Sequence, residues 1–103
     1  MNNELSLNDR NKILVMLMQA LWGAISPNFR MVAISLEKSP WKLLFVLEKE
    51  DAIDSEEIEE IETQFGALFD SGAIEYNAEV VITADPISWP DAPWTVVFRR
   101  RED

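Results

Sequence analysis

The chain has 103 residues and a formal charge of −10 at pH 7, because 19 acidic residues outnumber 9 basic ones. This length suits one domain with a hydrophobic core and is too small for two, and the negative charge repels phosphates, so we expect no nucleic-acid partner. The chain also lacks histidine and cysteine, which removes the commonest general base, the best thiol nucleophile and thiolate metal sites. We therefore expect no enzymatic activity and no cofactor. The N-terminus has no signal-peptide pattern, so we expect a cytoplasmic protein.

The first predicted element is a helix from about Asn8 to Ala24, capped by Ser6 or Asn8. One apolar stripe at helical spacing consists of Ile13, Leu17, Ala20, Leu21 and Ala24. Leu14, Met18 and Trp22 widen this stripe, so we expect the helix to be buried over more than half of its circumference. Its apolar run is too short to span a bilayer, and we expect no membrane partner.

Two strands joined by a short turn are predicted next, from Phe29 to Glu37 and from Trp41 to Glu48, because apolar residues alternate along both. A second helix should run from about Ser55 to Asp70. Asp54 and Glu57 match a capping-box pattern at its start, and Gly72 is placed to end it. Its core stripe is predicted to be Ile58, Ile61, Phe65 and Leu68.

A third strand is predicted from about Ile74 to Ala84, and a fourth from Trp94 to Arg100. The segment between them, Asp85 to Pro93, holds three prolines around Trp89 and should be a rigid loop. This order predicts one α+β domain over residues 1–103. Its architecture should be a two-layer sandwich of order α-β-β-α-β-β, with a four-stranded, mainly antiparallel sheet and two helices on one face.

The face of the sheet opposite the helices is predicted to be unusually apolar. Its residues should include Met31, Ala33, Leu44, Val46 and Val81. Monomeric proteins rarely leave such a patch open to water, so we expect a partner or a second copy of the chain to cover it.

Nine acidic residues fall within the fifteen positions from Glu48 to Glu62, accompanied only by Lys49. This cluster is either a solvated helix face or a surface that attracts a basic partner. In the second case the candidate partner-binding residues are Glu50, Asp51, Asp54, Glu56, Glu57, Glu59 and Glu60. The spacing of a calcium-binding loop is missing, and so are the usual hydrolase and nucleotide motifs, so we predict no metal, cofactor-binding or catalytic residues.

The chain has four tryptophans, which is many for its length. We expect Trp22 and Trp41 to belong to the core. Trp89 is either an exposed anchor for a partner or a lid on the edge of the sheet. Arg30 and the run from Arg99 to Arg101 can pair with acidic residues within the protein.

Several short motifs resemble a known group of proteins. They are Ala20-Leu21-Trp22-Gly23-Ala24-Ile25, Pro27-Asn28-Phe29-Arg30, the acidic second helix and Val97-Phe98-Arg99-Arg100-Arg101-Glu102. Together they resemble the small bacterial immunity proteins of contact-dependent growth inhibition and colicin-like systems. The resemblance covers nearly the whole chain. It implies a protein that binds a toxin domain and neutralises it, without catalytic residues.

The leading hypothesis is therefore a cytoplasmic immunity protein whose acidic helix occludes the basic surface of a toxin domain such as a nuclease. The alternative is a homodimeric structural or adapter protein, held together by the apolar sheet face and without a toxin partner.

Overall fold

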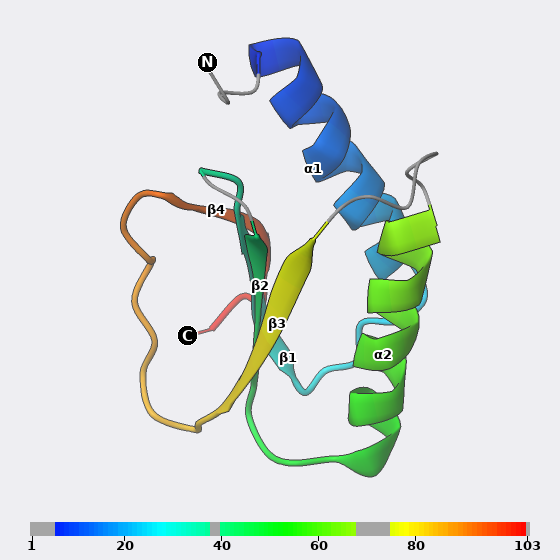
Figure 1. Ribbon diagram of the computed structural model, residues 1–103. Helices are drawn as coiled ribbons and strands as arrows, with labels where there is room; N and C mark the ends of the chain where they lie inside the picture. Colours follow the sequence, from blue (N-terminus) through cyan, green and yellow to red (C-terminus); the bar gives the residue numbers. More distant parts are fainter. Residues whose placement is uncertain (1–5, 38–39, 68–74, 103) are drawn as a thin grey trace.

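The computed structural model describes residues 6–37, 40–67 and 75–102. In chain order its elements are α1 (Leu7–Leu21), β1 (Phe29–Ser35), β2 (Trp41–Leu47), α2 (Ala52–Ala67), β3 (Tyr76–Ile82) and β4 (Trp94–Arg99). The strands form one sheet in the order β3-β2-β1-β4, and both helices cover the same face of it (Figure 1). The predicted α+β class and the predicted order of elements are confirmed.

The sheet is mixed, because β1 pairs antiparallel with β2 and β4 whereas β2 and β3 run parallel. A short turn joins β1 to β2 and enforces antiparallel pairing, while α2 carries the chain back along the sheet before β3 begins. We expected consecutive strands to be antiparallel neighbours, which holds for β1 and β2 only. Strands β3 and β4 instead lie at opposite edges, because the segment 83–93 crosses the sheet before β4 pairs with β1.

The core lies between the helices and the sheet. The most deeply buried large side chains are Phe29, Phe45, Phe65, Leu17, Ile34, Leu43, Leu47, Ile61 and Val32. The predicted apolar stripes of both helices are confirmed within the helices, since Ile13, Leu17 and Leu21 of α1 and Ile58 and Ile61 of α2 are buried. Ala24, the predicted last member of the first stripe, lies beyond the end of α1 and is half-buried. Residue Leu68 and the predicted helix end at Asp70 to Gly72 lie outside the described residues.

The wider buried surface predicted for α1 is wrong at Met18 and Trp22, which are 40% and 81% exposed. The helix ends at Leu21, and Gly23 turns the chain with a positive φ of 79°, so Trp22 does not continue the helical stripe. Trp41 is half-buried and packs against the core, as expected. The cap at Ser6 is confirmed, because its Oγ accepts a hydrogen bond from the Asp9 N–H at 3.0 Å.

Helix α2 begins three residues earlier than predicted. The capping group is Asp51, whose Oδ1 accepts a hydrogen bond from the Asp54 N–H at 3.0 Å. Asp54 therefore lies in the first turn, and the expected pairing of Asp54 with Glu57 is not the cap. Within the part of the chain that the structure describes, neither helix is long and apolar enough to cross a bilayer.

The centre of the sheet face opposite the helices is not open, which corrects the expectation that the whole apolar patch faces a partner. Met31, Ala33 and Val46 are at most 4% exposed within the single chain, while Leu44 and Val81 are half-buried. The segment 83–93 crosses this face, on the far side of the sheet from the helices (Figure 1). An internal segment thus supplies the cover that the sequence pattern assigned to a partner.

Asn28 ties the ends of the first two strands to the start of α2. Its Nδ2 donates to the Lys49 carbonyl at 2.7 Å and to Asp54 Oδ2 at 2.9 Å, and its Oδ1 accepts from the Lys49 N–H at 3.0 Å. Asp54 is only 4% exposed, so its carboxylate depends on these contacts in place of water. One side chain therefore fixes how α2 leaves the β1–β2 hairpin.

We predict that Asn28→Ala lowers the free energy of unfolding by about 1–3 kcal/mol, because it leaves the buried Asp54 carboxylate without this donor. Urea denaturation measures the effect as a lower midpoint with an unchanged slope. Asn11→Ala, at an exposed position of α1, is the matched control and should change stability by less than about 0.5 kcal/mol. Equal stability of the two variants would contradict the role given to Asn28.

Candidate functional site

The predicted acidic surface is present on α2 and the segment before it. Glu50, Glu56, Glu59 and Glu60 are exposed, and Glu57 is half-buried. They remain outside because the helix turns Ile58, Ile61 and Phe65 toward the sheet. The amphipathic pattern of the helix therefore directs these carboxylates to solvent.

The two aspartates of the predicted set have structural contacts. Asp51 is half-buried and caps α2 through its Oδ1. Asp54 is buried against Asn28. The structure thus separates the predicted residues into five outward-facing glutamates and two aspartates that hold the start of the helix.

No ion pair within the part of the chain that the structure describes neutralises the exposed glutamates of α2. Among the described residues, the ion pairs join Arg30 to Glu102 and Arg100 to Glu48 and Glu102, and none reaches α2. On the same helix, burial raises the pKa of Glu62, and the neighbouring Glu59 carboxylate raises it further. Such a surface attracts cationic groups, because an approaching positive charge offsets the repulsion between neighbouring carboxylates.

Arg30 and Arg100 pair instead with glutamates outside α2. Arg30 is 3% exposed and forms a two-point ion pair with Glu102, from Nε to Oε2 at 2.9 Å and from Nη2 to Oε1 at 2.8 Å. Its Nη1 donates to the carbonyls of Thr83 and Asp85 at 2.6 and 2.8 Å. Arg30 thereby joins β1, the start of the segment 83–93 and the C-terminal tail.

Arg100 extends this network toward the start of α2. Its Nη2 lies 2.9 Å from Glu48 Oε1 and 3.1 Å from Glu102 Oε2, and its Nη1 donates to the Pro27 carbonyl at 2.7 Å. Both Arg100 and Glu48 are partly exposed, so the pair between them is screened by water and contributes less than the buried pair at Arg30. The sequence analysis anticipated internal pairing of these arginines but not the burial of Arg30.

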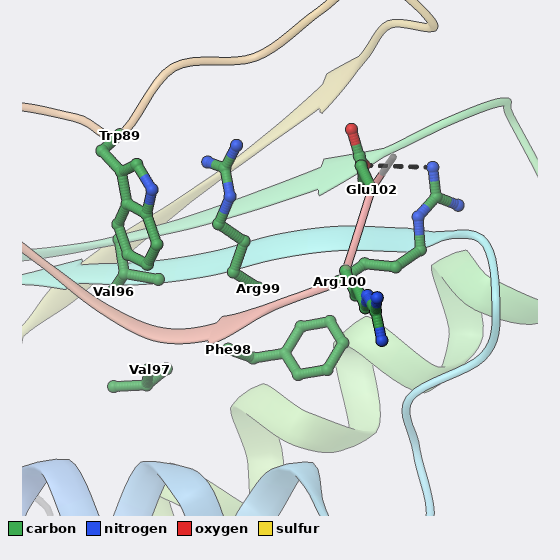
Figure 2. A pocket seen from close by; sticks show the side chains of 8 residues that line it. Trp89, Val96, Val97, Phe98, Arg99, Arg100 and Glu102 are labelled. Atoms are coloured by element: carbon green, nitrogen blue, oxygen red, sulfur yellow. Dashed lines mark ion pairs between the residues drawn. The ribbon is translucent and has the colours of Figure 1, made fainter.

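Trp89 lies on the face opposite the helices, over the last strand. Its ring packs against the Arg99 guanidinium, whose central carbon is 4.8 Å from the ring centroid, and Arg99 Nη2 donates to the Ile87 carbonyl at 3.1 Å. Figure 2 shows Trp89 and Arg99 on one side of β4, while Val97 and Phe98 point toward the helices. Trp89 is nevertheless 63% exposed. The ring is therefore held in place by a cation–π contact and still presents apolar surface.

An open depression of about 510 Å³ adjoins this pair. Its lining includes Trp89, Val96, Phe98, Arg99, Arg101 and Glu102. Arg99 Nη1 is buried and has no hydrogen-bond partner among the described residues. The predicted site residues thus fall on two surfaces that the sheet separates, with the glutamates on the helix side and Trp89 on the other.

No group of three or more acidic side chains within residues 6–37, 40–67 and 75–102 is arranged to hold a metal ion. What the exposed groups can do is make ion pairs, hydrogen bonds and apolar contacts with another macromolecule. The arrangement therefore fits a protein-binding surface.

Sequence reasoning missed the structural role of Asn28 and the burial of Arg30. Both residues belong to the motif Pro27-Asn28-Phe29-Arg30. The available signal was that two polar residues, Asn28 and Arg30, flank a phenylalanine at the start of a strand. Their roles depend on distant partners, since Asn28 binds Asp54, 26 residues further along the chain, and Arg30 binds Glu102, 72 residues further.

We predict that the Arg30–Glu102 pair makes stability depend on pH in the acid range. The hydrogen bonds from the Arg30 guanidinium lower the pKa of Glu102 to about 2. A carboxylate whose pKa is lower in the folded than in the unfolded state stabilises the fold above the unfolded pKa, and this contribution is lost as the pH falls through the folded pKa. The free energy of unfolding should therefore decline between about pH 5 and pH 2.

Glu102→Gln should remove part of that decline, so the two unfolding curves should converge at low pH and differ most near neutrality. Urea unfolding at several pH values measures this. Glu37→Gln, at an exposed position without an ion pair among the described residues, is the control and should leave the profile unchanged. Parallel profiles for Glu102→Gln and the unmodified protein would refute the assignment.

Residues 10–102 match the family model described as MafI2 immunity protein. No curated protein matches the chain. The match confirms the resemblance to small bacterial immunity proteins, and it runs from within α1 to the Glu102 that binds Arg30. Because this match covers almost the entire chain, the protein belongs to the MafI2 immunity protein family.

Proposed function

We propose that this protein binds a cognate toxin domain through the glutamates of α2 and blocks its basic functional surface. The observation that carries the proposal is the row of exposed carboxylates, Glu56, Glu59 and Glu60 with Glu50 and Glu57 beside them, which no cation among the described residues neutralises. Membership of an immunity family supplies the class of partner, a toxin protein.

A nuclease is the toxin class whose chemistry complements this surface. An enzyme that cleaves nucleic acid binds phosphates with lysine and arginine side chains. Carboxylates spaced along a helix present negative groups to the same cations, so they compete for the phosphate-binding groove. Attraction over a distance also speeds the encounter of the two proteins.

The mechanism is occlusion and requires no bond-making by the immunity protein. In this mechanism the exposed acidic groups bind the toxin and do not activate a nucleophile. One molecule of the inhibitor blocks one toxin molecule in the cytoplasm of the producing cell. Trp89 adds an apolar contact at a second point, because tryptophan buries a large area with little loss of conformational entropy.

Co-expression tests the function directly. The toxin domain encoded beside this gene should arrest growth when expressed alone, and growth should resume when the present chain is expressed with it. Purified proteins should form a one-to-one complex in which the toxin loses its activity. The proposal fails if no toxin is encoded there, or if the toxin remains fully active in the presence of excess partner.

We predict that association slows as salt rises from about 20 to 500 mM, because salt screens exposed charges beyond a few ångströms. Glu60→Lys should lower the association rate at low salt by roughly threefold to tenfold. Glu37→Lys changes the net charge by the same amount at an exposed position after β1 and should have little effect. Stopped-flow mixing measures both rates, and equal slowing by the two variants would show that net charge alone is responsible.

For the second contact, Trp89→Ala should weaken binding by about 2 kcal/mol, a roughly 30-fold rise in Kd. Trp22→Ala is the matched control, since Trp22 is also an exposed tryptophan, at 81%, but lies at the end of α1. Titration calorimetry measures the two affinities. If Trp22→Ala weakens binding and Trp89→Ala does not, the apolar contact belongs to α1.

A further inference from the structure

Strand β3 is a bare edge of the sheet. It stands at one end of the strand order, so only its β2 side is paired among the described residues. All its residues except Tyr76 and Val81 are exposed. The apolar side chains of Val80 and Ile82 are 43% and 45% exposed. The opposite edge differs, since every residue of β4 is half-buried and the segment 83–93 lies against it.

The backbone of β3 presents a regular row of free polar groups. The Trp41 N–H donates to the Glu75 carbonyl at 3.0 Å, and the Thr83 N–H donates to the Leu47 carbonyl at 2.9 Å. Backbone groups of successive strand residues point to opposite sides, so the odd-numbered residues pair with β2. The N–H and C=O groups that point outward belong to Tyr76, Ala78, Val80 and Ile82.

Apart from the charge of Glu79, this edge lacks the features that normally prevent another strand from pairing. The sequence of β3 contains no proline and no lysine, and its register with β2 is continuous over seven residues. Natural proteins usually interrupt exposed edges with such residues or with bulges. Here the bulges lie inside the sheet, in the pairing of β1 with its two neighbours.

We propose that β3 receives an extended, basic segment of the toxin as an added strand, an inference that rests on the proposed function. Glu75 and Glu79 share one face of β3, and Val80 and Ile82 share the other. The matching segment therefore alternates lysine or arginine with apolar residues. Main-chain hydrogen bonds supply affinity in this mode, and the side-chain alternation supplies specificity.

Charge favours the toxin segment over a second copy of this chain. In an antiparallel pair of two β3 strands centred on Glu79, like charges would lie directly opposite each other, which is destabilising. Each copy also carries a formal charge of −10, so two copies repel one another over their whole surface. A basic strand instead meets complementary carboxylates from β3.

Residue-resolved amide hydrogen exchange tests the proposal on this chain, free and bound to the toxin domain encoded beside its gene. In the free protein the N–H groups of Asn77, Glu79 and Val81 should be protected by β2, while those of Ala78 and Val80 exchange rapidly. On binding, the outward amides should slow by at least about tenfold. This alternating pattern distinguishes strand addition from side-chain contact or general stabilisation.

Ala78→Pro provides a second measurement, because it removes an outward N–H without removing a bond to β2. Its Kd should rise by at least about tenfold, while Ala78→Ser, which keeps the N–H, should bind like the unmodified protein. If Ala78→Pro fails to fold, the exchange pattern decides.

The outcomes separate this inference from the function on which it rests. A neutralised toxin that leaves the outward β3 amides unprotected overturns strand addition and leaves the immunity function intact. Outward amides that are already slow without toxin, together with a dimer in sedimentation, show that a second copy occupies the edge and overturn the proposal. Failure to bind the toxin at all overturns both.

Discussion

The buried Arg30 guanidinium holds together the side of the molecule that the helices do not cover. Its five donors fit a carboxylate and backbone carbonyls in one plane, and here they meet Glu102, Thr83 and Asp85. These partners belong to the C-terminal tail and to the segment that crosses the sheet. Together with the bond from Arg99 to the Ile87 carbonyl, these contacts hold a segment that contains no strand or helix between Ile82 and Trp94. The ion pair thus helps the segment 83–93 to cover the face of the sheet that the helices leave open.

That closure decides which surfaces remain for a partner. Met31, Ala33 and Val46 are buried by the chain itself, so the apolar sheet face offers no docking area there. The acidic flank of α2, the exposed edge of β3 and the ring of Trp89 remain. The first two differ in kind, since carboxylates attract from a distance whereas an unpaired strand edge binds only on contact. The carboxylates of α2 can therefore speed the association of a partner, while the edge of β3 slows its dissociation.

The elements and the core were predictable because they depend on periodicity, and Ile58, Ile61 and Phe65 are buried as their spacing indicates. The exposure of Trp22 was not, because it depends on where Gly23 turns the chain. The crossing segment was also unpredictable, because it depends on a bond between Arg30 and a residue 72 positions later. For the site, the sequence identified the acidic helix but not that Asp51 and Asp54 serve its start. Composition marks a charged surface, whereas burial and hydrogen bonding determine which of its members are available.

The distribution of the charges matters more than their total. Arg30 and Arg100 are engaged with Glu48, Glu102 and backbone carbonyls, and Arg99 lies under Trp89. Because these side chains are held in those contacts, none of them screens a glutamate of α2 through an ion pair. A solvated helix that served only solubility could tolerate such screening without loss. The carboxylates along α2 therefore keep a negative local field, and such a field attracts cationic groups.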